Sequence, residues 1–175
     1  MVKLSKKYKG ENMVMPSNSP NIEHQIYTMC MIQRNNEILL LKRPNHRGFP
    51  GYIAPGGKVD FPESIVQAAI REVKEETGLH VSNLTFKGVD EYVNPKGHVR
   101  YMVFNYWTDS FEGELLINPP EGELVWVPID TALNLPMQDW FKERFPLFFE
   151  KGTFEIQRVW DRDLDKQVAM TITHT

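Results

Sequence analysis

Three glutamates, Glu72, Glu75 and Glu76, stand at positions i, i+3 and i+4 of a segment with helical character. On a helix these positions share one face, so the three carboxylates are brought close together. Such a face could be a solvated acidic surface, because exposed like charges cost only roughly 0.2–0.5 kcal/mol per pair. It could instead bind a hard divalent cation, which prefers carboxylate and carbonyl oxygens as ligands.

A glycine turn, Pro55-Gly56-Gly57, precedes the acidic segment and favours the second alternative. A turn of this kind can direct backbone carbonyls at a site beside the helix. In proteins Mg²⁺ keeps several waters and links one or two carboxylates to the phosphates of a substrate. The glutamates and the turn together therefore indicate a platform for Mg²⁺ and a phosphate-containing ligand.

The helix that carries the glutamates is predicted over residues 64–77. Ser64 and Gln67 have the spacing of a capping box, and Gly78 stands where a left-handed C-terminal cap belongs. Runs rich in β-branched and aromatic residues predict strands before and after this helix. The predicted strands are 25–33, 37–42, 98–108, 123–128, 154–160 and 167–173, with one or two more segments, broken near Gly88, within 81–93.

The segments between the strands contain the remaining elements. Residues 43–57 and 109–122 are predicted to be loops, and 130–135 a helical turn. A second helix is predicted over 139–150, kinked or restarted by Pro146. Strands and helices in this order indicate an α+β domain with a central mixed β-sheet.

Length and composition limit the classes of function. The 175 residues fit one domain over 23–175, with 1–22 as an N-terminal arm. With 20 Lys and Arg against 23 Asp and Glu, the net charge of −3 argues against a stable duplex nucleic-acid partner and against an anionic membrane. Cys30 is the only cysteine, which excludes an intramolecular disulfide and a zinc knuckle. Without a secretory leader or a long apolar run, a cytoplasmic location is expected.

The residues from Gly57 to Leu79 resemble the Nudix box. Five residues separate Gly57 from Glu63, and seven separate Glu63 from the run REVKEETGL at 71–79. With the flanking strand pattern, the resemblance extends over 23–160 and implies the Nudix α/β/α sandwich. It also implies hydrolysis of a nucleoside diphosphate linked to another group X, with Mg²⁺, or Mn²⁺ in its place, as cofactor.

The resemblance implies roles for residues in and near the box. The metal ligands would be the Gly56 carbonyl and the carboxylates of Glu72, Glu75 and Glu76. Glu75 or Glu76 would also orient or deprotonate water, whereas Glu63 and Arg71 would join loop and helix through an ion pair.

Further site residues are expected outside the box. Glu121 would be an additional metal ligand or base, with Glu123 as its alternative, although either could be a solvated loop acid. Arg43 and Lys58 are candidates for contacts with phosphate. In each case an exposed side chain without a functional role is the competing interpretation.

The sequence outside the box resembles MutT-like enzymes that remove oxidised purine triphosphates such as 8-oxo-dGTP. The similar stretches are EGELVWVP at 121–128 and RFPLFFEKGTF at 144–154. Asp139 and Trp140 lie near where that branch reads the purine edge and stacks the base, which an aromatic face can do for any base. Trp140 could equally be a core residue. Ile53 stands where one oxidised-purine subgroup has a base-reading Asn, so that subgroup's purine contacts do not carry over directly.

The leading expectation is thus hydrolysis of a purine nucleoside triphosphate, a small-molecule substrate, to the monophosphate and pyrophosphate. Alternatives within the family are ADP-ribose, a nucleotide sugar, a dinucleoside polyphosphate or a capped RNA 5′ end. Alternatives of another class are a nucleotide-sensing module without turnover and a scaffold with an idle acidic helix. The oligomeric state stays open.

Overall fold

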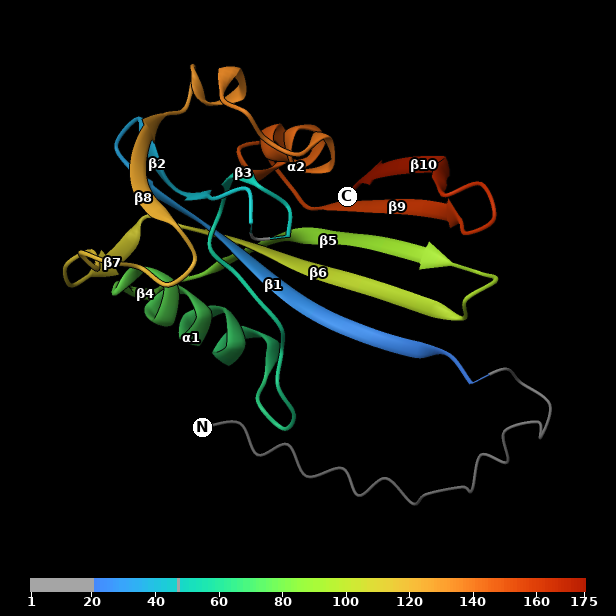
Figure 1. The fold of residues 1–175 in the computed structure, drawn as a ribbon. Coiled ribbons are helices and arrows are strands. Elements are labelled where there is room, and N and C mark those ends of the chain that lie inside the picture. The colour runs from blue at the N-terminus through green and yellow to red at the C-terminus, as the bar shows by residue number, and fades with distance from the viewer. Residues whose placement is uncertain (1–20, 47) are drawn as a thin grey trace.

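The computed structural model describes residues 21–46 and 48–175, so nearly all of the predicted arm lies outside the described residues. A mixed sheet forms the centre, in the order β10-β9-β5-β6-β1-β2-β3, with β8 also paired to β2 (Figure 1). Its strands are β1 (Glu23–Arg34), β2 (Glu37–Arg43), β3 (Gly51–Ile53), β5 (Thr85–Asn94), β6 (Val99–Thr108), β8 (Glu123–Pro128), β9 (Phe154–Asp161) and β10 (Lys166–His174). The helices are α1 (Ile65–Thr77), α2 (Asp139–Arg144) and the 3₁₀ turns η1 (Ala132–Asn134) and η2 (Phe145–Phe148).

Different helices cover the two faces of the sheet. Successive side chains along β1 point to opposite faces, so the strand contributes to a core on each side. Cys30 and Ile32 point to one face and pack in the core cluster that includes Val73 of α1. Met29 and Met31 point to the other face, where Phe141 of α2 packs against them. Figure 1 shows α1 and α2 on opposite sides of the strands. The expected α/β/α sandwich with a mixed sheet is therefore confirmed.

Strand β1 connects the two halves of the sheet, and the glycine turn lies along one edge of this strand. It pairs in parallel with β6 along most of its length, but with β2 only next to the connecting turn. Over the rest of that edge, residues 55–59 take the place of β2. Cys30 N donates to Pro55 O at 2.9 Å, and Thr28 N donates to Gly57 O at 2.8 Å.

Two short strands fall inside the predicted loops and correct them. β3 lies within 43–57 and pairs with the end of β2, while β7 (Ser110–Glu112) lies within 109–122 and pairs with β4 (His80–Ser82). A strand of three residues is too short to show a hydrophobic period in the sequence. Whether it forms depends on pairing with a strand from another segment.

The break predicted near Gly88 is also misplaced. The chain breaks between β4 and β5 around Asn83, which has a left-handed φ of 50°. Gly88 instead lies inside β5, where the register with β6 shifts between Phe86 and Gly88. The glycine therefore marks a β-bulge within one strand rather than the end of a strand.

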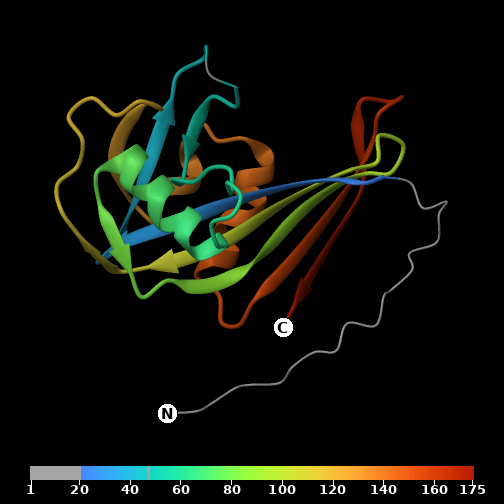
Figure 2. The same cartoon turned by 90° about the horizontal axis from the view of Figure 1, so that it is seen from below.

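The C-terminal part follows the prediction. Pro146 stands at the start of η2, so the second helix is restarted as a 3₁₀ turn. β9 and β10 form the expected final hairpin, and together with β1, β5 and β6 they extend beyond both helices (Figure 2). No helix among residues 21–46 and 48–175 is long and apolar enough to cross a membrane.

Candidate active site

Helix α1 presents the glutamates because both of its ends are fixed. The predicted capping box is present: Gln67 N donates to Ser64 Oγ at 3.2 Å, and Ser64 N donates to Gln67 Oε1 at 2.9 Å. Gly78 forms the left-handed C-cap with a φ of 85°. Ala69 and Val73 bury one side of α1 against the sheet, which leaves the acidic side next to the glycine turn.

Two of the three glutamates contact the glycine turn directly. The backbone N–H of Gly56 donates to Glu76 Oε2 at 2.9 Å. The carboxylate of Glu72 lies against Gly57, where a Cβ atom would overlap it. Position 57 therefore requires glycine for the close approach of the Glu72 carboxylate, not for a turn alone.

The electrostatic environment of these carboxylates is unfavourable to their charged forms. Burial raises the pKa of Glu76 to about 8, and the neighbouring carboxylates of Glu72 and Glu121 add to the shift, although the Gly56 N–H opposes it. Burial also raises the pKa of Glu72, an effect that the ion pair with Arg71 only partly offsets. Both carboxylates are therefore harder to ionise than a solvated glutamate, chiefly because they are withdrawn from water.

Arg71 supplies the countercharge that the chain itself provides. Its guanidinium donates to Glu63 twice, at 2.7 and 3.1 Å, to Glu72 at 2.7 Å and to Glu75 at 3.1 Å. It also donates to the carbonyl of Lys58 at 2.9 Å. The expected ion pair of Glu63 with Arg71 is present and connects the loop to α1.

Glu75 differs from the other two glutamates. Its side chain is 58% exposed and pairs with Arg71 at 3.1 Å, at the outer side of the site. Among residues 21–46 and 48–175, no three Asp, Glu, His or Cys side chains converge at metal-ligand spacing. Glu75 thus lies further out than Glu72 and Glu76, and its role as a metal ligand stays a prediction.

The chemistry of the site nevertheless fits a divalent cation. The partly buried carboxylates of Glu72 and Glu76 lie beside a turn rich in backbone groups, and the raised pKa of Glu76 reflects mainly its withdrawal from water. Hard oxygen donors in such a setting suit Mg²⁺ or Mn²⁺. The cation would offset the electrostatic cost of ionising these desolvated carboxylates next to each other.

Arg43 and Glu121 are brought to the same region from β2 and from the loop before β8. Arg43 Nη2 donates to Glu121 Oε2 at 3.2 Å, and both residues interact electrostatically with Glu76. A pocket of about 480 Å³ adjoins them, lined in part by Lys42 and Gly122. Glu123 instead forms a 3.6 Å exposed pair with Lys42, so Glu121 is the better placed acid of the two.

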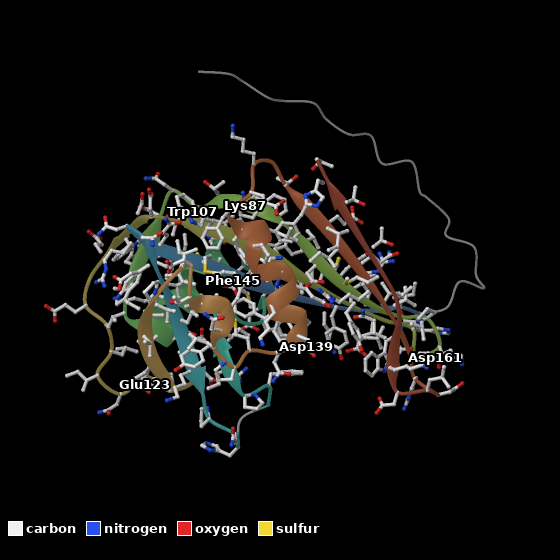
Figure 3. The ribbon with its side chains drawn as sticks, turned by 90° about the horizontal axis from the view of Figure 1, so that it is seen from above. Lys87, Trp107, Glu123, Asp139, Phe145 and Asp161 are labelled. Atoms are coloured by element: carbon white, nitrogen blue, oxygen red, sulfur yellow. The ribbon has the colours of Figure 1, made fainter. Side chains whose placement is uncertain are left out.

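The remaining predicted site residues lie elsewhere. The Lys58 side chain is exposed, and only its carbonyl contacts the Arg71 network. Asp139 is the exposed first residue of α2, labelled in Figure 3, on the face of the sheet opposite to α1. Trp140 follows it and packs its ring edge-on to Phe49, with ring centroids 5.9 Å apart. Asp139 and Trp140 therefore belong to a second group, beside the 49–51 segment.

Sequence reasoning missed a buried charged cluster on this second face, formed by Asp90, Arg144 and Arg158. One signal for it was present. Arg158 follows Phe154 and Ile156 at the two-residue period of a core-facing strand surface, where a charged residue needs a buried partner.

The NUDIX domain family matches residues 23–148, a range that includes the glutamates and the glycine turn described above. The chain belongs to the Nudix family. Over 116 residues it is 37% identical to a Bacillus subtilis protein named Uncharacterized Nudix hydrolase YvcI, a match that covers 65% of this chain and 72% of that protein.

Two further comparisons point to different members of the family. ADP-ribose pyrophosphatase of Methanocaldococcus jannaschii is 40% identical over 108 residues, which are 61% of this Nudix chain and 61% of that protein. The crystal structure of the mutator MutT protein from Bacillus halodurans has a TM-score of 0.73 at 31% identity, covering 85% of this chain and 97% of that one.

Proposed function

We propose that this Nudix hydrolase cleaves a purine nucleoside triphosphate to the monophosphate and pyrophosphate, with Mg²⁺ as cofactor. Membership of the family supports hydrolysis of a nucleoside diphosphate linked to another group. The observation that carries the proposal is the pairing of the desolvated Glu76 carboxylate with the Gly56 N–H, at 2.9 Å, beside Glu72.

The metal would be held by Glu72, Glu76 and the Gly56 carbonyl, with Glu75 and Glu121 as further ligands. Pro55 and Gly57 both direct their carbonyls at β1, and successive carbonyls of extended backbone alternate in direction. The Gly56 carbonyl is therefore expected on the side where its N–H meets Glu76. When bound, Mg²⁺ would act as a Lewis acid on phosphate oxygens and lower the pKa of water.

Residues of the chain would position the phosphates and the attacking water. Phosphoryl transfer depends mainly on charge neutralisation and in-line geometry. Arg43 suits the first task, because its partly exposed guanidinium lines the pocket and can donate to a phosphate oxygen. Lys58 is a second candidate from the exposed side of the turn. Glu75 or Glu76 would orient the water or accept its proton.

An oxidised purine such as that of 8-oxo-dGTP is the proposed base, which would make the enzyme a cytoplasmic sanitiser of the nucleotide pool. Asp139 is exposed and can accept hydrogen bonds from a purine edge, while Trp140 and the 62% exposed Phe49 offer aromatic faces. ADP-ribose is the alternative substrate, favoured by the name of the relative from Methanocaldococcus jannaschii.

The test is a panel of nucleotides incubated with the full chain and Mg²⁺, with products resolved by chromatography. We expect 8-oxo-dGTP to give 8-oxo-dGMP and pyrophosphate with a higher kcat/KM than dGTP. Glu76→Gln should lower kcat by about 100-fold or more, since it removes a metal ligand or base. Glu155→Gln, at an exposed position of β9, is the matched control and should keep the rate.

Other outcomes would replace the proposal. Cleavage of ADP-ribose without action on triphosphates would transfer the activity to the alternative substrate. Nucleotide binding without product would indicate a sensing module. A Glu76→Gln variant with an unchanged rate would contradict the assignment of the metal site.

A further inference from the structure

The side chain of Arg144 is completely buried between α2 and the sheet. Its Nε, Nη1 and Nη2 atoms have no hydrogen-bond partner among residues 21–46 and 48–175. The closest countercharge is Asp90 on β5, whose Oδ2 lies 3.6 Å from Arg144 Nη1. Burial lowers the pKa of Arg144 to about 10, so the guanidinium remains charged at neutral pH.

A second buried arginine, Arg158 on β9, completes the cluster. Its Nε donates to Asp90 Oδ1 at 3.1 Å, and its Nη1 donates to Glu143 on α2. Its Nη2 also lies 3.4 Å from the backbone carbonyl of Trp140. The cluster thus joins the short helix α2 to β5 and β9 through contacts to three of its residues, Trp140, Glu143 and Arg144.

Stability alone does not account for this arrangement. Buried ion pairs are often replaced by apolar side chains of similar volume without loss of stability, and an unpaired guanidinium is costly to bury. What the charged group provides is a fixed partner for an aromatic ring. Arg144 Cζ lies 5.2 Å from the centroid of the Trp140 ring, within the range of a cation–π contact.

We propose that Arg144, held by Asp90, is a positioning residue that fixes the Trp140 ring for contact with the nucleotide base. This inference rests on the proposed function, in which Trp140 stacks the base. The Trp140 ring would be held by two neighbours, the Arg144 guanidinium and the perpendicular Phe49 ring, with its backbone tied to Arg158. The cluster would then affect the affinity for the base and not the cleavage step, whose residues lie on α1 and the glycine turn.

The test compares Arg144→Met, which keeps the volume and removes the charge, with Arg144→Lys, which keeps a cation near the ring. Arg100→Met is the matched control, since Arg100 is a partly exposed arginine that pairs with Glu91 on the same sheet. The first readout is the emission of Trp140, isolated by subtracting the spectrum of the same protein carrying Trp140→Phe. We expect Arg144→Met to shift this emission to the red and to increase its quenching by acrylamide, and Arg144→Lys to restore both.

The second readout is steady-state kinetics with the purine triphosphate and with 2-deoxyribose 5-triphosphate, which lacks the base. Arg144→Met should raise KM for the nucleotide by up to about tenfold, because a Trp140 ring that is no longer fixed must be ordered when the base binds, and should leave kcat nearly unchanged. KM for the substrate without a base should not change. A residue that only stabilises the fold would lower the Tm and would not discriminate between the two substrates.

The two proposals fail in different ways. Absence of nucleotide turnover in the unmodified protein would overturn the proposed function, while the Trp140 emission would still decide whether Arg144 positions the ring. Unchanged Trp140 emission in Arg144→Met would overturn the positioning role. So would a rise in KM that is equal for both substrates, because the base would then not be the affected group.

Discussion

At the scale of single residues, Glu76 is the side chain whose properties depend most on a bound cation. It is desolvated and lies beside other carboxylates, so its pKa is raised to about 8 and its protonated form is favoured at neutral pH when no metal is present. A proton and Mg²⁺ therefore compete for the same oxygens. The charged carboxylate that would bind the metal therefore destabilises the chain when the metal is absent.

The pKa of Glu76 predicts how the metal-free protein responds to pH. Its folded-state pKa of about 8 lies above the ordinary glutamate value, so protonation of Glu76 favours the folded state. This contribution to the free energy of unfolding is fully present below about pH 4.5 and is lost as pH rises through 8. In EDTA, Glu76→Gln should be more stable than the unmodified protein at pH 9, by on the order of 3 kcal/mol. At pH 5 the two should differ little. Urea denaturation at both pH values measures the difference, and an equal effect at pH 5 and pH 9 would contradict it.

Gly57 provides a second prediction at this scale. In Gly57→Ala the new methyl group would overlap the Glu72 carboxylate and displace it from the turn. We expect kcat/KM to fall by about 100-fold, as for loss of a metal ligand, while far-UV circular dichroism stays unchanged. Gly48→Ala is the matched control, because a Cβ atom there has open space around it. Similar rates for both variants would show that the close approach at Gly57 has no role in turnover.

At the scale of elements, the N-terminal cap of α1 has a measurable energy. Ser64→Ala removes the side-chain acceptor of Gln67 N and should lower the free energy of unfolding by about 1 kcal/mol. For a chain of this size that corresponds to a fall in Tm of about 2–4 °C. Ser64→Asn keeps an acceptor and should retain most of the stability. An equal loss in both variants would mean that the cap does not stabilise α1.

The same element shows how much the sequence alone could predict. Helix α1, its two caps and its acidic face follow from residues within a single segment, and the structure has them as expected. β3 and β7 were not predicted, because each is defined by pairing with a distant strand. Asp90 and Arg144 illustrate the same limit for the second face: their relation depends on α2 packing over β5, which no local pattern encodes.

The candidate site likewise has features that the sequence predicted and features that it could not predict. The acidic face of the helix was expected beside the glycine turn, and the resemblance to the Nudix box implied the ion pair of Glu63 with Arg71; the structure has both contacts. It could not predict that Arg71 would also hold Glu75 at the outer side, because that depends on side-chain geometry with several carboxylates competing for one cation.

At the scale of the whole molecule, cation binding should stabilise the fold. A ligand that binds only the folded state adds about 2.7 kcal/mol at a free concentration one hundred times its Kd. We expect Mg²⁺ to raise the Tm in differential scanning calorimetry, EDTA to reverse the shift, and Glu72→Gln to abolish it. The Glu155→Gln variant should respond as the unmodified protein does. A Tm that does not change with Mg²⁺ in any variant would exclude binding at this site in the concentration range used.

The parallel pairing of β1 with β6 also affects how the chain is made. Glu23 pairs with Val99 and Ile32 with Thr108, so β1 meets this partner only after about 75 further residues have been added. At a translation speed of about 5–20 residues per second, the edge of β1 that pairs with β6 lacks its partner for several seconds during synthesis. Because this pairing is non-local, refolding in vitro should take milliseconds to seconds rather than microseconds.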